Sequence, residues 1–257
     1  MKTIYIERSS GQGRDGDWVE KLDLEGVDRI VVGTGPGSFA GIRSAIAFAQ
    51  GYALGRNCEV LGLPSPCAVA AKVFTAQGTV PIPPTGSVPI QPTGTVPFPP
   101  TGSVPTRLAV VGDARCGKLW IAVFDGYRLE NDVFQVDREK IVDTIDGLEG
   151  EPCLVVTADE QRIGSFLSEA FADRRIGGQT PRDGWGQTPR DAGGQTPEEG
   201  GQAPGIGGQT PQYIGGQTPQ YIGGQTPDAE GLRIFAEANP AILQPEPLPI
   251  YLNPAVR

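Results

Sequence analysis

Two repeat tracts rich in proline and glycine limit what this sequence can fold into. Residues 79–105 repeat a unit of the form TVPIPPTG, and residues 177–227 repeat GGQTP with variable endings. Proline lacks a backbone N–H and fixes its φ angle, so the first tract is excluded from helices and central strands and favours an extended linker. The second tract has too few apolar side chains to offset the entropy lost on ordering. We expect both tracts to be disordered insertions.

A repeat can also indicate a solenoid, but each solenoid unit needs an apolar face for its neighbours to cover, and these units lack one. The exceptions are Tyr213, Ile214, Tyr221 and Ile222, in two identical GGQTPQYI copies. Their side chains could form a motif for a partner. Near-identical tandem copies are more typical of a surface loop that tolerates expansion, so we expect the tract to lie outside the core.

Three blocks remain, at residues 1–78, 106–176 and 228–257, and together they are long enough to bury a sizeable core. We expect the first block to form a shortened N-terminal lobe and the second block to form another lobe. The third block predicts a helix at 229–238 and an extended tail at 249–252, which would complete the core.

The first block has the pattern of a strand, a glycine-rich turn and a helix. Residues 28–32 end in a continuous apolar run and predict a strand. Helical spacing of apolar residues then predicts a helix that Ser38 caps and Gly55 ends. A second short strand is predicted at 60–63, and Ser65 is placed to cap the helix after it.

The second block predicts a hairpin whose strands, at 108–111 and 119–124, flank a turn at 113–117. A further strand is predicted at 153–157 and an amphipathic helix at 161–171. This alternation of strands and helices indicates an α/β fold.

The formal net charge of -9 argues against strong direct binding of nucleic acid, which depends on clustered Lys and Arg. The cysteines, Cys58, Cys67, Cys116 and Cys153, form no CxxC pair, and the chain has no histidine to complete a zinc site. We therefore expect neither a metal nor a cofactor. The N-terminal residues lack the apolar stretch of a signal peptide, and no run approaches the length of a membrane span, so we expect a cytoplasmic protein.

The segment GTGPGSFAGIR at residues 33–43 is the most informative motif. A strand, a glycine turn and a helix start can present backbone N–H groups to an anion. A variant dinucleotide fingerprint would use Gly35, Gly37 and Ala40, but no acidic residue ends the following strand. No Lys-Ser or Lys-Thr pair follows the glycines, which excludes a P-loop.

Ser38 stands at a turn where hydrolases place a nucleophile. Pro36 occupies the position where that turn needs glycine, and the chain offers no histidine as a general base. An N-cap is the favoured interpretation. In the second block, Asp113 and Arg115 are more typical of a local clamp than of a catalytic pair. Glu7 follows the first predicted strand and would be a single acid with no obvious partner.

These motifs resemble those of the TsaB family, also called YeaZ, within the Gcp-like group. Residues 35–43 are similar to the family's GPGSFTGLR, and residues 113–117 are similar to its DAR-x-G turn. Residues 62–65 and 249–252 are similar to two further family segments. The residues that carry the resemblance are Gly35, Pro36, Gly37, Ser38, Phe39, Gly41, Arg43, Asp113, Arg115 and Gly117.

The resemblance implies an actin-like, sugar-kinase-like (ribonuclease H-like) fold with two lobes. It also implies a non-catalytic subunit that supports the catalytic paralogue TsaD, with the ATPase TsaE, in forming N6-threonylcarbamoyladenosine next to the tRNA anticodon. A homodimer is the alternative pairing. The motif residues would be structural or partner-facing, and we expect the contact with TsaD on the apolar faces at 42–54 and 68–73.

The chain departs from the family pattern before Gly33. The family has a three-stranded meander and a long helix there, whereas this chain has only a short segment, and Lys118 stands where the family has Glu. A second hypothesis is residual nucleotide phosphotransfer, with Ser9, Ser10 and Gly11 forming the phosphate turn and Glu7 or Asp113 holding a metal. A divergent remnant is a third hypothesis, and a peptidase has no nucleophile, base or metal site to support it.

Overall fold

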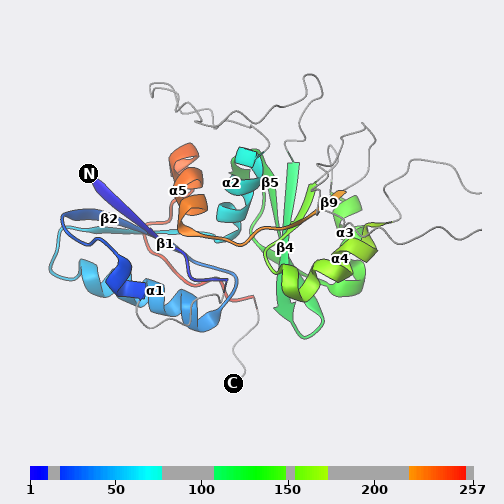
Figure 1. Ribbon diagram of the computed structural model, residues 1–257, viewed down its shortest axis with the longest axis horizontal. Helices are drawn as coiled ribbons and strands as arrows, with labels where there is room; N and C mark the ends of the chain where they lie inside the picture. The colour runs from blue at the N-terminus through cyan, green and yellow to red at the C-terminus, as the bar shows by residue number, and fades with distance from the viewer. Residues whose placement is uncertain (11–17, 77–106, 149–153, 173–219, 253–257) are drawn as a thin grey trace, which may run out of the picture.

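The computed structural model describes residues 1–10, 18–76, 107–148, 154–172 and 220–252, which form two β-sheets with helices between and around them (Figure 1). The first repeat tract, most of the second and Cys153 lie outside the described residues, as does Gly11. The predicted α/β fold is confirmed.

The smaller sheet is parallel throughout. It contains β1 (Lys2–Ile6), β2 (Val27–Gly33) and β3 (Glu59–Leu63), in that spatial order. The chain passes from β1 to β2 by way of η1 (Trp18–Lys21), and the two strands pair directly. The described part of this connection contains no further strand, which agrees with the short segment in the sequence.

Helix α1 (Phe39–Ala53) follows β2 and covers one face of the smaller sheet (Figure 1). The predicted N-cap is confirmed, because the Ser38 hydroxyl accepts a hydrogen bond from the Gly41 N–H at 3.4 Å. Apolar residues recur at helical spacing, so one side of the helix packs on the strands. The buried members of this cluster are Ile42, Ala45, Ile46 and Ala49 from the helix and Ile6, Val27, Ile30 and Val32 from the sheet.

The larger sheet is mixed. Its order is β6 (Arg128–Leu129), β5 (Lys118–Asp125), β4 (Arg107–Arg115), β8 (Leu154–Thr157) and β9 (Gln220–Gly224), and β7 (Phe134–Asp137) also pairs with β5. Strands β4 and β5 form the predicted hairpin. Its loop residues, Cys116 and Gly117, have φ angles of 52° and 74°, the left-handed geometry that tight hairpin loops favour.

Strand β9 corrects one prediction. It lies inside the GGQTP tract, which we expected to be disordered, yet residues 220–224 pair in parallel with β8 at the edge of the larger sheet. The expectation failed there because this copy carries Tyr221 and Ile222, which pack against the apolar clusters on the two faces of the sheet. A strand that packs against apolar clusters formed by its neighbours needs few apolar residues of its own.

Short helices cover the outer face of the larger sheet. They are η2 (Arg138–Lys140), α3 (Ile141–Asp146), η3 (Glu160–Gly164) and α4 (Ser165–Ala170). The helix predicted at 161–171 is therefore found in two parts, a π-helical turn followed by α4. Ile141, Ile145, Ile163 and Leu167 bury their side chains against this face.

Two helices lie between the sheets, α2 (Pro66–Ala76) and α5 (Ala229–Ala238), and they pack side by side (Figure 1). The predicted helix at 229–238 is confirmed. A β-carbon added at Gly231 would lie 2.3 Å from the Ala68 carbonyl oxygen, so only glycine permits this approach of the helices. Side chains from α2, α5 and strands of both sheets form one apolar cluster, so the two halves share a core.

After α5 the chain forms η5 (Pro240–Ile242) and returns to the smaller sheet. Gln244 pairs with Gly62, and the Ile250 N–H donates to the Thr34 carbonyl at 2.8 Å. The predicted tail at 249–252 is thus held along the end of β2. No helix within the described ranges is long and apolar enough to cross a membrane.

Candidate functional site

The glycine-rich turn after β2 is built around a buried carboxylate, Glu7. The Ser9 N–H donates to Glu7 Oε1 at 2.6 Å, and a β-carbon on Gly33 would lie 2.0 Å from the other carboxylate oxygen. Burial raises the pKa of Glu7 above its ordinary value, and hydrogen bonds from Ser9 and Ser65 offset part of that effect. Gly33 therefore makes room for an acid in the interior.

Ser65 forms hydrogen bonds that the sequence did not predict. Its hydroxyl accepts from the Gly35 N–H at 3.0 Å and also bonds to Glu7, while its own N–H donates to the Gly35 carbonyl at 2.9 Å. Ser65 directly precedes α2, where a cap would stand, and its hydroxyl joins the turns that precede α1 and α2. Sequence spacing does not reveal this contact between residues far apart in the chain.

The remaining motif glycines also make close contacts. A β-carbon on Gly37 would lie 2.3 Å from the Ser9 carbonyl oxygen, and one on Gly41 would lie 2.1 Å from the Arg8 carbonyl oxygen. The Ser38 N–H donates to the Ser9 carbonyl at 2.7 Å. The start of α1 is therefore packed against the chain after β1, and this segment covers backbone groups that an anion would need.

Phe39 and Arg43 lie on the outside of this turn. Phe39 is 58% exposed, its ring centroid lies 5.5 Å from that of Tyr251, and the Arg43 guanidinium carbon lies 5.0 Å from the Phe39 centroid. The structure thus joins the first motif to the tail that the sequence analysis singled out separately. The interaction is exposed and does not extend into the interior.

The second motif, at the β4–β5 turn, is held by carboxylates. Asp113 Oδ1 accepts from the Arg115 N–H at 2.9 Å, and Asp113 Oδ2 lies 3.2 Å from Arg162 Nη1 and 3.7 Å from Arg115 Nε. Asp113 thus clamps its own turn, as the sequence predicts, and also ties that turn to Arg162, which is distant in the sequence. Gly117 has space around it and supplies only a positive φ angle of 74° to the turn.

Asp159 is an acid that the sequence analysis missed. It follows β8, and its Oδ2 accepts from the Asp113 N–H at 2.9 Å. Burial raises the pKa of Asp159, while the Asp113 N–H and Arg162 act in the opposite direction. Its only signal in the sequence is its place just after a buried strand, the end at which α/β proteins gather polar side chains.

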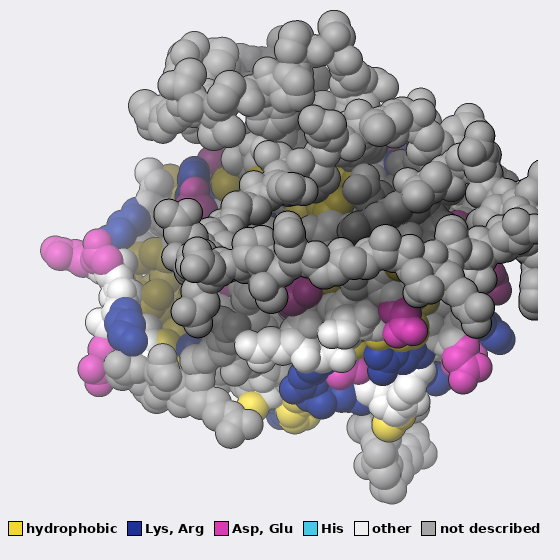
Figure 2. All heavy atoms as spheres, turned by 45° about the vertical axis from the view of Figure 1, so that its right-hand side comes forward, with side chains coloured by type: hydrophobic (Ala, Val, Ile, Leu, Met, Phe, Trp, Pro, Cys, Tyr) yellow, Lys and Arg dark blue, Asp and Glu magenta, His cyan; other side chains and the backbone are white. Residues whose placement is uncertain are grey.

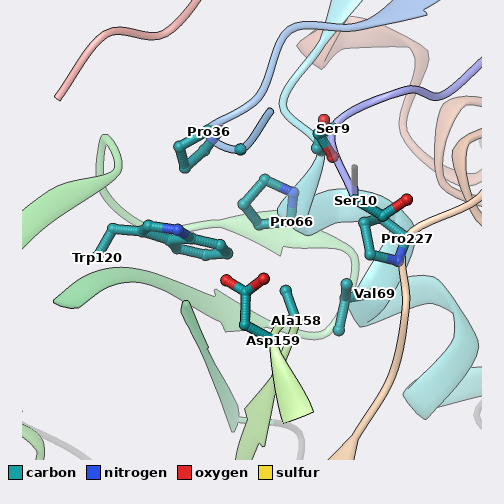
Figure 3. A pocket seen from close by; sticks show the side chains of 11 residues that line it. Ser9, Ser10, Pro36, Pro66, Val69, Trp120, Ala158, Asp159 and Pro227 are labelled. Atoms are coloured by element: carbon teal, nitrogen blue, oxygen red, sulfur yellow. The ribbon is translucent and has the colours of Figure 1, made fainter. Parts of the chain in front are cut away.

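A small pocket lies where these turns approach one another (Figure 3). Trp120 and Asp159 line it from the larger sheet, and the Asp159 carboxylate points toward Trp120 and Pro66. The described residues around the pocket are Ser9, Ser10, Pro36, Gly37, Ser65, Pro66, Val69, Trp120, Ala158, Asp159 and Pro227. The first motif thus reaches the pocket directly, and the second reaches it through Asp159.

The described side chains that line this pocket are either acidic or uncharged. None of the described lining residues is Lys or Arg, whereas Asp159 is in the wall and Glu7 bonds to two lining serines. Trp120 is 3% exposed, and its Nε1 has no hydrogen-bond partner among the described residues. Among those same residues no group of three or more His, Cys, Asp or Glu side chains could hold a metal ion. Such a lining does not favour a polyphosphate, which needs positive charge.

One family model matches part of the chain. Residues 20–88 match the model of the family described as TsaD, tRNA N6-adenosine threonylcarbamoyltransferase. This stretch contains β2, α1, β3 and α2 and includes the first motif. No curated protein matches the chain.

Two solved structures from Pseudomonas aeruginosa are similar to the chain. The first, an uncharacterized protein with similarity to peptidase YeaZ, has a TM-score of 0.50 and 19% identity over 93% of this chain and 80% of that one. The second, YeaZ, has a TM-score of 0.48 and 18% identity over 91% of this chain and 79% of that one. Identity this low shows the fold alone, and the first structure supports it. The chain therefore has a fold similar to that of a YeaZ-like protein, and its segment from β2 to α2 matches the TsaD family model.

Proposed function

We propose that this chain is a TsaB-like partner subunit that supports TsaD in N6-threonylcarbamoyladenosine modification of tRNA, without chemistry of its own. The observation that carries the proposal is the match of residues 20–88 to the TsaD family model, in a chain with a YeaZ-like fold. The matched segment contains α1, the helix with the more open outer face.

The geometry of the motif supports an accessory role. Gly33, Gly37 and Gly41 are needed for close packing, and the Ser38 hydroxyl is used as a helix cap. The pocket does not support the hypothesis of nucleotide phosphotransfer. Ser10 lines the pocket, but none of the described lining residues carries a positive charge. On the face in Figure 2, the described Lys and Arg side chains are interspersed with Asp and Glu, which does not favour a phosphate-backbone track.

The contact surface for TsaD that the sequence suggested, at 42–54 and 68–73, has to be changed. Residues 68–73 of α2 are buried within the chain, apart from a half-buried Lys72, so this helix offers no apolar face to a partner. On α1 the buried residues, Ile42, Ala45, Ile46 and Ala49, pack into the chain's own core. The exposed residues of α1 include four small ones, Ala40, Ser44, Ala47 and Gly51, together with Phe39, Arg43 and Gln50, and Leu54 is exposed just after the helix.

We place the TsaD contact on this outer face of α1. Small side chains let the backbone of a partner helix approach closely, and the exposed Phe39 and Leu54, 58% and 78% exposed, would gain from burial. Two copies of this chain could pair through the same face.

The test is co-expression with TsaD from the same genome, followed by pull-down and size exclusion. We expect a stable complex with the unaltered chain, and loss of that complex in Ala47→Glu. Ala229→Glu is the matched control, since it introduces the same charge at an exposed alanine of α5. If the unaltered chain forms no complex at low salt, the proposed function is wrong. If Ala47→Glu binds as well as the control does, only the surface is wrong.

A further inference from the structure

Strand β9 comes from a sequence that the chain contains twice. Residues 220–227 are QYIGGQTP, and residues 212–219 are the same eight residues in the same order. The downstream copy contains all of β9 and the segment that leads to α5. Any contact that the downstream side chains make is therefore chemically available to the upstream copy.

The place beside β8 selects for a tyrosine and an isoleucine. Tyr221 pairs with Val155, packs on the face that α4 covers, and donates its hydroxyl hydrogen to the Glu160 carboxylate. Ile222, the next residue, packs on the opposite face of the sheet against the core shared by the two halves. One side chain is needed on each face, as strand geometry requires.

The same place also requires two glycines. Gly223 has a φ angle of +97°, and a β-carbon on Gly224 would lie 2.5 Å from the Glu160 β-carbon. Further along, the Gln225 N–H donates to the Thr157 carbonyl at 2.8 Å, and Lys72 Nζ donates to the Thr226 carbonyl at 3.0 Å. The β8 edge therefore selects residue types at four positions, a tyrosine, an isoleucine and two glycines, and holds the next two residues through their backbone.

Few copies of the repeat satisfy these requirements. Residues 205–211, GIGGQTP, have the isoleucine and both glycines but carry glycine in place of tyrosine. The first copy, at 177–181, has the isoleucine and both glycines but Arg175 in place of tyrosine, and the copies at 193–197 and 200–204 have neither the tyrosine nor the isoleucine before their glycines. Residues 212–219 alone reproduce the whole pattern upstream of β9.

Connection lengths also permit the upstream copy. Its use would lengthen the link to α5 by the eight residues of the second copy, and the entropy of closing a loop rises only slowly with length. A parallel strand beside β9 is excluded for the upstream copy, because only residues 217–219 would connect the two strands and a parallel crossover needs many more.

We propose that the β8 edge is a strand-binding site for QYIGGQTP, and that residues 212–219 occupy it in exchange with residues 220–227. The strand at this edge then alternates between two registers eight residues apart. The proposal rests on the contacts of β9 and on the sequence of the tract. It is independent of any role with TsaD.

Three variants test the exchange by thermal unfolding: Tyr213→Ala with Ile214→Ala, Tyr221→Ala with Ile222→Ala, and all four changes together. We expect the upstream pair to leave Tm unchanged and the downstream pair to lower it by less than half of the loss seen with all four. Gln195→Ala with Thr196→Ala, in a copy without the tyrosine, is the control and should leave Tm unchanged.

Hydrogen exchange of the downstream pair gives a second measurement that does not need the fourfold variant to fold. We expect the amides of residues 213–217 to exchange at least tenfold more slowly in that variant than in the unaltered chain. Equal losses of Tm for the downstream pair and the fourfold variant, with no new protection at 213–217, would overturn the proposal. A loss of Tm from the upstream pair alone would also overturn it, since it would place that copy in a separate, permanent structure.

Discussion

Helices α1 and α2 come from one stretch of similar composition, yet they are buried differently. Helix α1 buries one stripe of four residues on the smaller sheet and leaves its other side exposed. Helix α2 buries eight of its 11 residues, because α5 and strands of both sheets surround it. The difference shows that apolar composition alone does not identify a surface for partners. What distinguishes the helices is their surroundings, because α1 has a sheet on one side only, whereas α2 lies among α5 and strands of both sheets.

The largest expected difference in stability comes from placing the same charge in each helix. Ala70→Glu introduces an unpaired carboxylate at a fully buried position of α2 and should cost roughly 4 kcal/mol or more of unfolding free energy. Ala47→Glu, on the exposed side of α1, should change stability by no more than about 0.5 kcal/mol. Urea unfolding followed by circular dichroism measures both. Equal losses would mean that the outer face of α1 is buried in the free chain.

Two glycine-to-alanine substitutions test the same difference in burial with smaller changes in stability. Gly231→Ala places a β-carbon against the Ala68 backbone of α2 and should cost about 1–3 kcal/mol. Gly51→Ala, on the open side of α1, has no atom within 4 Å of the new β-carbon and should gain about 0.5–1 kcal/mol from better helix propensity. The Tm values should therefore move in opposite directions. A loss of stability for Gly51→Ala would contradict the open face.

The smallest effect concerns Glu7, which lies under the turns that precede both helices. Its pKa is raised by burial, so the folded state binds its proton more tightly than the unfolded state does. Its contribution to stability therefore decreases as pH rises from about 4.5 through the folded pKa. Glu7→Gln removes this titration, so its stability relative to the unaltered chain should increase between pH 4.5 and pH 7.5. Each unit of pKa difference corresponds to about 1.4 kcal/mol. A constant difference across urea titrations at several pH values would show that Glu7 does not titrate differently on folding.

Much of the fold was predictable because its signals are local. The strands at 28–32 and 60–63, the Ser38 cap and the 229–238 helix depend on spacing within one segment, and the structure has each of them. The π-helical turn at 160–164 was not foreseen, because its residues have the same apolar spacing as the helix that continues it. Strand β9 was missed because its stability comes from neighbours, and composition argued against it.

The site was predictable only in part, for the same reason. The glycine motif and the hydrogen bond between Asp113 and Arg115 stand where the sequence placed them. The bond of Ser65 to Gly35 and the bond of Asp159 to Asp113 were missed, because these partners are distant in the sequence. No pattern within one segment reports a hydrogen bond between two turns.

The cluster that joins α2 and α5 to strands of both sheets has a mechanical consequence. Two-lobed proteins that close on a ligand do so by hinging at an interface with few buried contacts. Here any rotation of one sheet against the other would separate fully buried side chains of this cluster, such as Leu63 of β3, Phe74 of α2 and Phe124 of β5. The two sheets should therefore move together as one rigid body. Any opening and closing of a complex that contains this chain would then occur at its interfaces with other subunits.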